Sequence, residues 1–175
     1  LVVLAVGASP RLELATAAGL RTSEAVAGSG VAVDAALLSS VPGVYAIGDI
    51  AAHAHPRLGP LRVEHWANAK YQGEHVAAVL LGEAGDYSGS PYFFSDQYDL
   101  GCEYRGLADP AKDELVVRGD LAARDFTAFW LREGAVVAAM NVNQWDDGDA
   151  LDALVGNGVR VSAADLREGD LAALS

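Results

Sequence analysis

The sequence predicts two regions of different fold class: an α/β region, then a small α+β region with an antiparallel sheet. The apolar run at residues 1–6 is typical of a strand buried on both faces of a parallel sheet. A second apolar strand is predicted at 44–48. Glycine and serine are then frequent over residues 82–90, after which short aromatic and β-branched runs recur. We therefore expect one domain over residues 1–85 and a second over residues 86–175.

The first region reads as strands alternating with helices. Pro42-Gly43 marks a turn, and Gly82 is the residue type that most often follows a helix end. The predicted elements, in order, are a strand at 1–6, a helix at 12–20, a strand at 31–33, a strand at 44–48, a loop at 50–62 and a helix from about Arg62 to Leu81.

The second region reads as a meander of strands followed by helices. Arg132-Glu133-Gly134 is a tight hairpin turn, and Ser162 to Asp165 resembles a capping box that opens a final short helix. Another helix is expected from Asp149 to Gly156 or Gly158, capped by the acidic run before it. The predicted strands are 92–95, 100–104, 115–118, 126–131 and 135–140.

Composition excludes several classes of function. The chain has 175 residues and a net charge of -12, whereas nucleic-acid binders carry a basic footprint. No apolar stretch reaches the roughly 18 residues of a membrane span, so a cytoplasmic protein without membrane contact is expected. The lone Cys102 excludes an internal disulfide and is expected to be a small core residue. Because the strand at 1–6 needs partners, we expect the chain to be the C-terminal part of a larger protein.

The most informative motif is Gly48-Asp49, which ends an apolar run. Such an ending brings backbone close to a ligand and places an acid where open α/β sheets bind ligands. The alternative is an ordinary Asx turn, and these residues alone leave both open. The run from Ser40 to Asp49 resembles the second flavin-binding motif of the FAD-dependent pyridine-nucleotide oxidoreductases. That resemblance implies that Asp49 accepts a hydrogen bond from a ribityl hydroxyl of FAD.

A second motif runs from Glu64 to Gly73. A helix N-terminus offers unpaired N–H groups and partial positive charge, and Asn68 and Gln72 are candidate polar anchors one helical turn apart. The alternative is an amphipathic helix with a core tryptophan. The segment resembles the Glu-x-Trp-x-Asn-Ala-x-x-Gln-Gly stretch of the ferredoxin and rubredoxin reductases. The resemblance implies that the helix start at Glu64, His65 and Trp66 lies against the isoalloxazine.

The third motif is Pro91 to Tyr98, which resembles the entry into the C-terminal domain of the same reductases. Phe94 stands where tryptophan is common, so an aromatic role against the flavin is kept while the indole N–H is lost. An ordinary strand is the alternative. In family order, the motifs imply part of a Rossmann-like FAD/NAD(P)-binding domain followed by the reductase C-terminal domain.

The resemblance implies a flavoprotein oxidoreductase that passes electrons from NAD(P)H through FAD to a ferredoxin- or rubredoxin-type iron–sulfur partner. The cofactor-binding residues expected are Gly48, Asp49, Glu64, His65, Trp66 and Phe94. No catalytic acid or base and no metal site is expected, and no G-x-G-x-x-G turn is present in the sequence. We therefore expect the chain alone to be inactive and not to hold FAD, with both fingerprints upstream.

Two other classes stay open. One is a non-enzymatic module that uses its small sheet for protein interaction, and the other is an apoptosis-inducing-factor-like flavoprotein. An acidic ferredoxin would need a basic patch, for which the sequence offers Arg105, Arg118, Arg124 and Arg132. His53 and His55 are expected to be solvated side chains in a loop.

Overall fold

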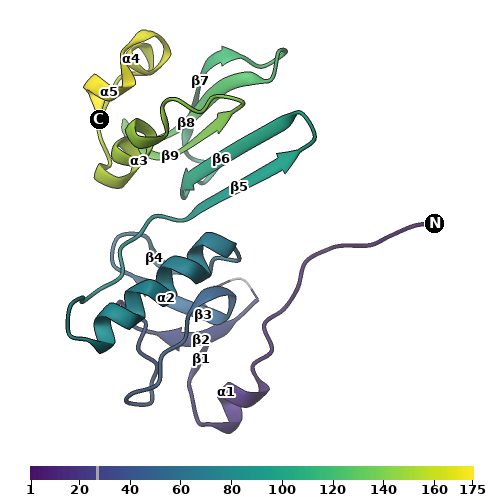
Figure 1. Ribbon diagram of the computed structural model, residues 1–175, viewed down its shortest axis with the longest axis vertical. Coiled ribbons are helices and arrows are strands. Elements are labelled where there is room, and N and C mark those ends of the chain that lie inside the picture. The colour runs from purple at the N-terminus through teal and green to yellow at the C-terminus, as the bar shows by residue number, and fades with distance from the viewer. Residues whose placement is uncertain (27) are drawn as a thin grey trace. The chain divides into compact units, whose positions relative to one another are not determined.

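The computed structural model describes residues 1–26 and 28–175, which form two compact units. The first unit is Leu1–Ser88 and the second is Gly89–Ser175. Each unit has its own sheet and its own hydrophobic core (Figure 1).

The first unit is a four-stranded mixed sheet with one long helix. The strands lie in the order β1-β2-β3-β4; β2 and β3 are parallel, and the other two pairs are antiparallel. Its core includes Val31, Leu37 and Val76. The elements are α1 (Glu13–Ala17), β1 (Thr22–Ser23), β2 (Gly30–Val33), the 3-10 turn η1 (Gly48–Ile50), β3 (Ala51–His55), β4 (Gly59–Leu61) and α2 (Trp66–Leu80).

The predicted strand at residues 1–6 is wrong. The segment belongs to no strand, and its apolar side chains are exposed. Figure 1 shows it as an extended stretch leading into α1. An apolar run becomes a buried strand only when a neighbouring strand pairs with it, and none of the described residues does so.

The predicted strand at residues 44–48 is also wrong. Its one ladder contact is an isolated bridge between Tyr45 and Leu38. Val44 and Ile47 are each 37% exposed, and the backbone turns at Gly48 into η1. The buried strand comes directly afterwards as β3, inside the segment expected to be a loop. There Ala51 pairs with Val31 of β2, and β4 completes a hairpin with β3.

The long helix is confirmed, but α2 begins at Trp66 and not near Arg62. Its buried face consists of Ala67, Asn68, Gln72 and Val76. Gly82 follows the C-cap residue Leu81 with a φ of +75°, the left-handed conformation expected after a helix end.

The second unit is a five-stranded antiparallel sheet in the order β5-β6-β9-β8-β7, followed by three helices. Phe129, Val136 and Ala139 of the sheet meet Leu151 and Leu166 of the helices in one core, so the helices cover one sheet face. The elements are β5 (Tyr92–Gln97), β6 (Leu100–Gly106), β7 (Glu114–Asp120), β8 (Asp125–Arg132), β9 (Ala135–Val142), α3 (Gly148–Asn157), α4 (Ala163–Glu168) and α5 (Leu171–Leu174).

Two local signals in the second unit, the hairpin turn and the capping box, are confirmed, whereas the acidic cap of α3 and the core position of Cys102 are not. Glu133 and Gly134 both have positive φ, as a two-residue hairpin turn requires. Ser162 caps α4, because its hydroxyl accepts from the Asp165 N–H at 3.1 Å. Asp147 occupies the N-cap position of α3 but makes no side-chain capping hydrogen bond. Cys102 lies in β6 and is half-buried, not fully in the core.

Over the described ranges, no helix combines the length and the apolar character needed to cross a membrane.

Candidate cofactor site

The Gly48–Asp49 turn lies directly against α2. Gly48 is buried with a φ of +70°, and a Cβ added there would lie 3.1 Å from Cβ of Ala69. Both the left-handed backbone and the close approach to the helix therefore call for glycine. Asp49, one residue later, is exposed. The sequence signal was right about a tight glycine followed by an accessible carboxylate, although the expected strand before it is missing.

The N-terminus of α2 is the second part of the site. His65 is the N-cap residue and makes no side-chain capping hydrogen bond, so the first turn's N–H groups have no side-chain acceptor from it. Trp66 is 71% exposed, which rules out the core tryptophan of the alternative interpretation. Asn68 is buried and donates from Nδ2 to the carbonyl of Val63 at 3.2 Å, which holds the approach to the helix.

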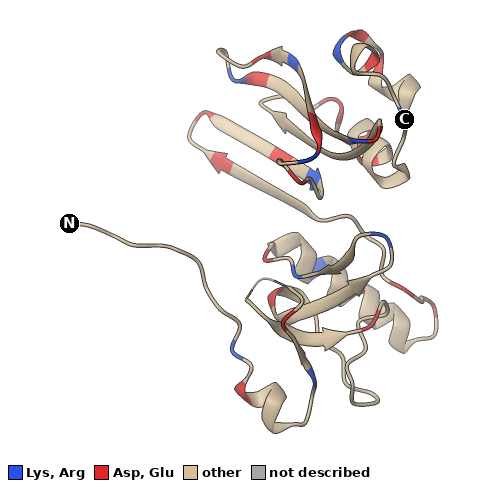
Figure 2. Ribbon diagram, turned by 180° about the vertical axis from the view of Figure 1, so that it is seen from behind, with Lys and Arg blue, Asp and Glu red and all other residues tan. Residues whose placement is uncertain are grey.

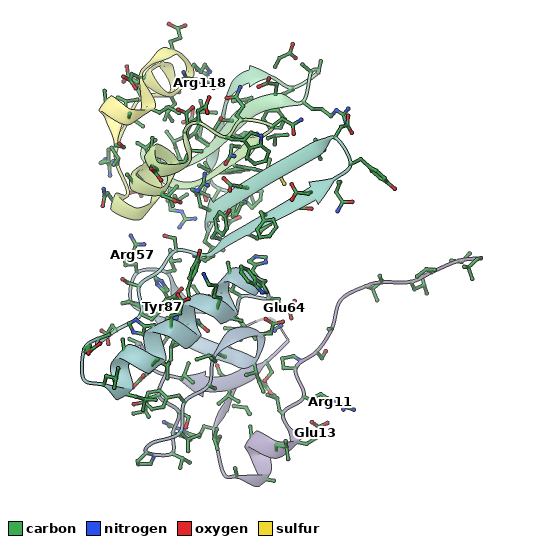
Figure 3. The ribbon with its side chains drawn as sticks, in the orientation of Figure 1. Arg11, Glu13, Arg57, Glu64, Tyr87 and Arg118 are labelled. Carbon is green, nitrogen blue, oxygen red and sulfur yellow. The ribbon has the colours of Figure 1, made fainter. Side chains whose placement is uncertain are left out.

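Two side chains tie the turn to its surroundings. The Gly48 N–H donates to Oε1 of the buried Gln72 at 2.7 Å. Nη1 of Arg62 donates to the Asp49 carbonyl oxygen at 2.8 Å and to Oε1 of Glu64 at 2.6 Å. The Arg62 side chain is only 7% exposed. Arg62 therefore links Asp49 to Glu64, whose position before α2 is visible in Figure 3.

Arg62 is the residue that sequence reasoning missed. Arg62 and Asp49 are 13 positions apart in the sequence, and no local sequence pattern predicts their contact. Gln72 was recognised as a polar anchor, but its partner, 24 residues away, was not. Lys70 adds a cation near the exposed ring of Trp66, with Nζ 5.9 Å from the ring centroid, and it pairs with Glu74 at 3.6 Å.

Phe94 belongs to the second unit. It lies on β5 opposite Glu103 of β6, and it is 54% exposed. The first unit thus brings together Gly48, Asp49 and Glu64 through Arg62 and Gln72, with His65 and Trp66 at the same helix start.

The arginines considered for a basic patch are occupied within the second unit. Arg105 is buried against Glu103 at 2.9 Å and Asp152 at 2.7 Å. Arg118 donates to the Gly169 carbonyl. Arg124 pairs with Asp99, and Arg132 binds Asp113 through two hydrogen bonds. Figure 2 shows acidic and basic residues close together along the ribbon of this unit, and three of the four arginines, Arg105, Arg124 and Arg132, are paired with carboxylates.

The expectation for His53 and His55 is wrong. Both lie in β3, at 1% and 3% exposure, and Nε2 of His53 is 3.2 Å from the Ala35 carbonyl oxygen. The ring of Tyr87 lies against both His53 and His75. Burial lowers the pKa of His53, so it is neutral in the folded protein near neutral pH. Within the described ranges, no group of three or more candidate ligands forms a metal site.

The first unit fits one edge of a flavin. Arg62 links the turn that carries the exposed Asp49 to Glu64, just before the 15-residue helix α2, whose first residue is the exposed Trp66. The glycine turn also lies close to this helix. A carboxylate accepts hydrogen bonds from hydroxyls, while a helix N-terminus favours a carbonyl oxygen that gains negative charge. These are the two polar features at the ribityl and N1/C2=O side of FAD.

Two family models match, one in each unit. Residues 1–73 match the pyridine nucleotide-disulphide oxidoreductase model, and residues 92–173 match the reductase C-terminal model. The chain therefore belongs to the pyridine nucleotide-disulphide oxidoreductases that carry a reductase C-terminal domain. This confirms the resemblance found in the sequence, the fold class, and FAD and NAD(P)H as the cofactors of the family.

Relatives at 30–45% identity are ferredoxin reductases. The chain is 44% identical over 146 residues to the 5,5'-dehydrodivanillate O-demethylase ferredoxin reductase subunit of a Sphingobium species, covering 82% of this chain and 35% of that protein. It is 36% identical to putidaredoxin reductase of Pseudomonas putida, over 82% of this chain and 33% of that one. The chain thus spans about a third of the length of these relatives.

Solved structures agree. The ferredoxin reductase for the CYP199A2 system of Rhodopseudomonas palustris matches with a TM-score of 0.87 and 36% identity, over 98% of this chain and 42% of that one. The covalent putidaredoxin reductase–putidaredoxin complex matches with a TM-score of 0.80 and 32% identity, over 91% of this chain and 37% of that one.

Proposed function

We propose that this chain supplies the C-terminal part of an FAD-dependent NAD(P)H:ferredoxin reductase. Residues 1–85 contribute the last part of the FAD/NAD(P)-binding region, and residues 86–175 are the reductase C-terminal domain. The observation that carries the proposal is the glycine turn at Gly48, which holds an exposed Asp49 beside the uncapped start of α2.

Asp49 binds the ribityl chain. Its carboxylate is exposed, while its own carbonyl oxygen is engaged by Arg62, so the backbone is fixed and the side chain faces solvent. An ionised carboxylate offers only acceptors, which match the hydroxyl donors of a sugar alcohol. Gly48 contributes by allowing the turn to lie close to the helix.

The start of α2 acts on the N1/C2=O edge. Its first-turn N–H groups and the helix dipole favour negative charge there. The carboxylate of Glu64, just before this helix start, accepts a hydrogen bond from the Arg62 guanidinium at 2.6 Å and is therefore held next to Arg62. His65 sets the entry of the chain into the helix in an extended conformation.

Trp66 and Phe94 supply aromatic surface to the isoalloxazine. Each residue is more than half exposed, as a ring that packs on a bound cofactor would be. When bound, FAD supplies the hydride acceptor and the one-electron donor of the reaction. The residues of this chain bind and orient the flavin and exclude water from it, and no acid or base among them is required.

The electron acceptor that we propose is a ferredoxin- or rubredoxin-type iron–sulfur protein. The relatives' names support the ferredoxin type. The net charge of -12 argues against nucleic acid as a partner of this chain. We propose that the reaction takes place in the cytoplasm, without contact to a membrane.

The test is the FAD content of the gene product that contains residues 1–175. Asp49→Ala should lower the flavin absorbance retained per protein after desalting, because a ribityl contact is lost. Asp86→Ala is the matched control, since Asp86 is an exposed aspartate of the same unit far along the chain from the turn. Equal FAD retention in the two variants would refute the role of Asp49. A gene product with no affinity for FAD would favour the protein-interaction module.

A further inference from the structure

The segment of α2 from Ala69 to Gly73 contacts the turn at Ile47 and Gly48. Ala69 and Gly73 lie one helical turn apart and are both small. A Cβ on Gly48 would meet Ala69, and a Cβ on Gly73 would meet Cδ1 of Ile47 at 3.5 Å. Ile47 and Gly48 therefore pack against the helix face formed by these two small residues.

Gln72 lies on the same face and supplies the polar contact. Its side chain is 2% exposed, and its Oε1 is the acceptor for the Gly48 N–H at 2.7 Å. Without this acceptor a buried backbone donor would be left unpaired, which is unfavourable. The contact is therefore a strong constraint on where the turn can lie.

Arg62 holds the other side of the same turn. Its Nη1 reaches the carbonyl of Asp49, one residue beyond the N–H that Gln72 binds. The guanidinium is itself confined: a Cβ placed on Gly28 would lie 2.7 Å from its Nη2. The N–H of Gly48 and the carbonyl oxygen of Asp49 are thus hydrogen-bonded to the nearly buried side chains of Gln72 and Arg62, while Asp49 itself is left exposed.

We propose that Gln72 and Arg62 are positioning residues that fix the Asp49 carboxylate relative to the start of α2. This inference rests on the proposed function, because it assumes that Asp49 binds the cofactor. Neither side chain touches the ligand in this account. Each restricts the turn before the cofactor binds. The conformational entropy of ordering Asp49 is therefore not lost on binding, and the affinity for FAD is higher.

The first experiment measures the turn without cofactor. In the gene product that contains the chain, freed of FAD, Gln72→Met keeps the length of the side chain and removes the acceptor, so the Gly48 amide should exchange its hydrogen faster. Gln72→Glu keeps an acceptor oxygen and should restore protection. An unchanged exchange rate at Gly48 in Gln72→Met would overturn the inference.

The second experiment is a double-mutant cycle on FAD dissociation from the gene product that contains the chain. Gln72→Met should weaken FAD binding by about 3- to 10-fold, the effect of one neutral hydrogen bond. Arg62→Met should weaken it by at least as much, because the guanidinium is charged. In the Asp49→Ala background the same changes should have less than about a 2-fold effect, since sites that act through one another are not additive. A merely structural role would give equal factors in both backgrounds.

The outcomes separate the two proposals. If Asp49→Ala leaves FAD dissociation unchanged, the role of Asp49 fails and the positioning role fails with it. If Asp49→Ala weakens binding but the Gln72 and Arg62 effects are additive to it, only the positioning role is overturned. Arg132→Met is the control, because it breaks an ion pair in the second unit without contact to the turn.

Discussion

Replacing Gly48 by alanine tests the geometry on which the site depends. The backbone there has a φ of +70°, which costs an L-residue about 1–2 kcal/mol. The new Cβ would lie 3.1 Å from Cβ of Ala69, whereas carbon atoms prefer about 3.5–4.0 Å. Forcing an extra methyl group into such a contact costs about 1–3 kcal/mol. The sum predicts that Gly48→Ala destabilises the first unit by about 2–5 kcal/mol.

Two comparison variants separate the dihedral cost from the crowding. Gly43 has a φ of +79° in the same unit and nothing within 4 Å of an added Cβ, so Gly43→Ala should cost only about 1–2 kcal/mol. Ala69→Gly removes the methyl group that Gly48→Ala meets and leaves the Ala69 Cα at 3.5 Å. In that background Gly48→Ala should also cost only about 1–2 kcal/mol.

Amide hydrogen exchange in β2 and β3 is the assay, because it reports the free energy of opening of the first unit alone. The two units have separate cores, so one unfolding transition of the whole chain would mix their stabilities. If Gly48→Ala costs no more than Gly43→Ala, or if Ala69→Gly gives no relief, the close approach of turn and helix is refuted.

Two further predictions concern titrating groups. His53 faces His55, His75, Asp34 and Tyr87, and burial lowers its pKa. The unfolded chain therefore binds a proton at His53 at a higher pH than the folded chain does. The stability of the first unit should therefore fall as the pH drops below about 6.5, by up to about 1.4 kcal/mol per pH unit, and His53→Phe should flatten that slope in hydrogen exchange. The hydrogen bonds from Arg132 lower the pKa of Asp113, so their contribution is present above the carboxyl's ordinary value of 3.8 and is lost as the pH falls through the folded-state value. Arg132→Met should cost about 1–3 kcal/mol at pH 7, measured by amide hydrogen exchange in β8 and β9 of the second unit, and much less in acid, and an equal cost at both pH values would contradict the pairing.

The second unit could be predicted from sequence because its signals are local. Alternating strands joined by a turn such as Glu133-Gly134 specify their own partners, and the Ser162 cap acts within one helical turn. The first unit could not, because its strands depend on partners far along the chain. β3 forms where Ala51 finds Val31 of β2, which makes two histidines buried in spite of their polarity. The apolar run at 1–6 has no such partner among the described residues and stays extended.

The Gly48–Asp49 signal was informative even though the strand predicted before it does not exist. What the chemistry needs from this motif is a left-handed turn and an accessible carboxylate, and both are properties of two adjacent residues. The position of the turn is a different property. Gln72 and Arg62 hold it through hydrogen bonds to residues that are 24 and 13 positions away in the sequence. A sequence motif can therefore mark a candidate binding residue such as Asp49, whereas a distant residue such as Arg62, which holds the turn, has no local signal.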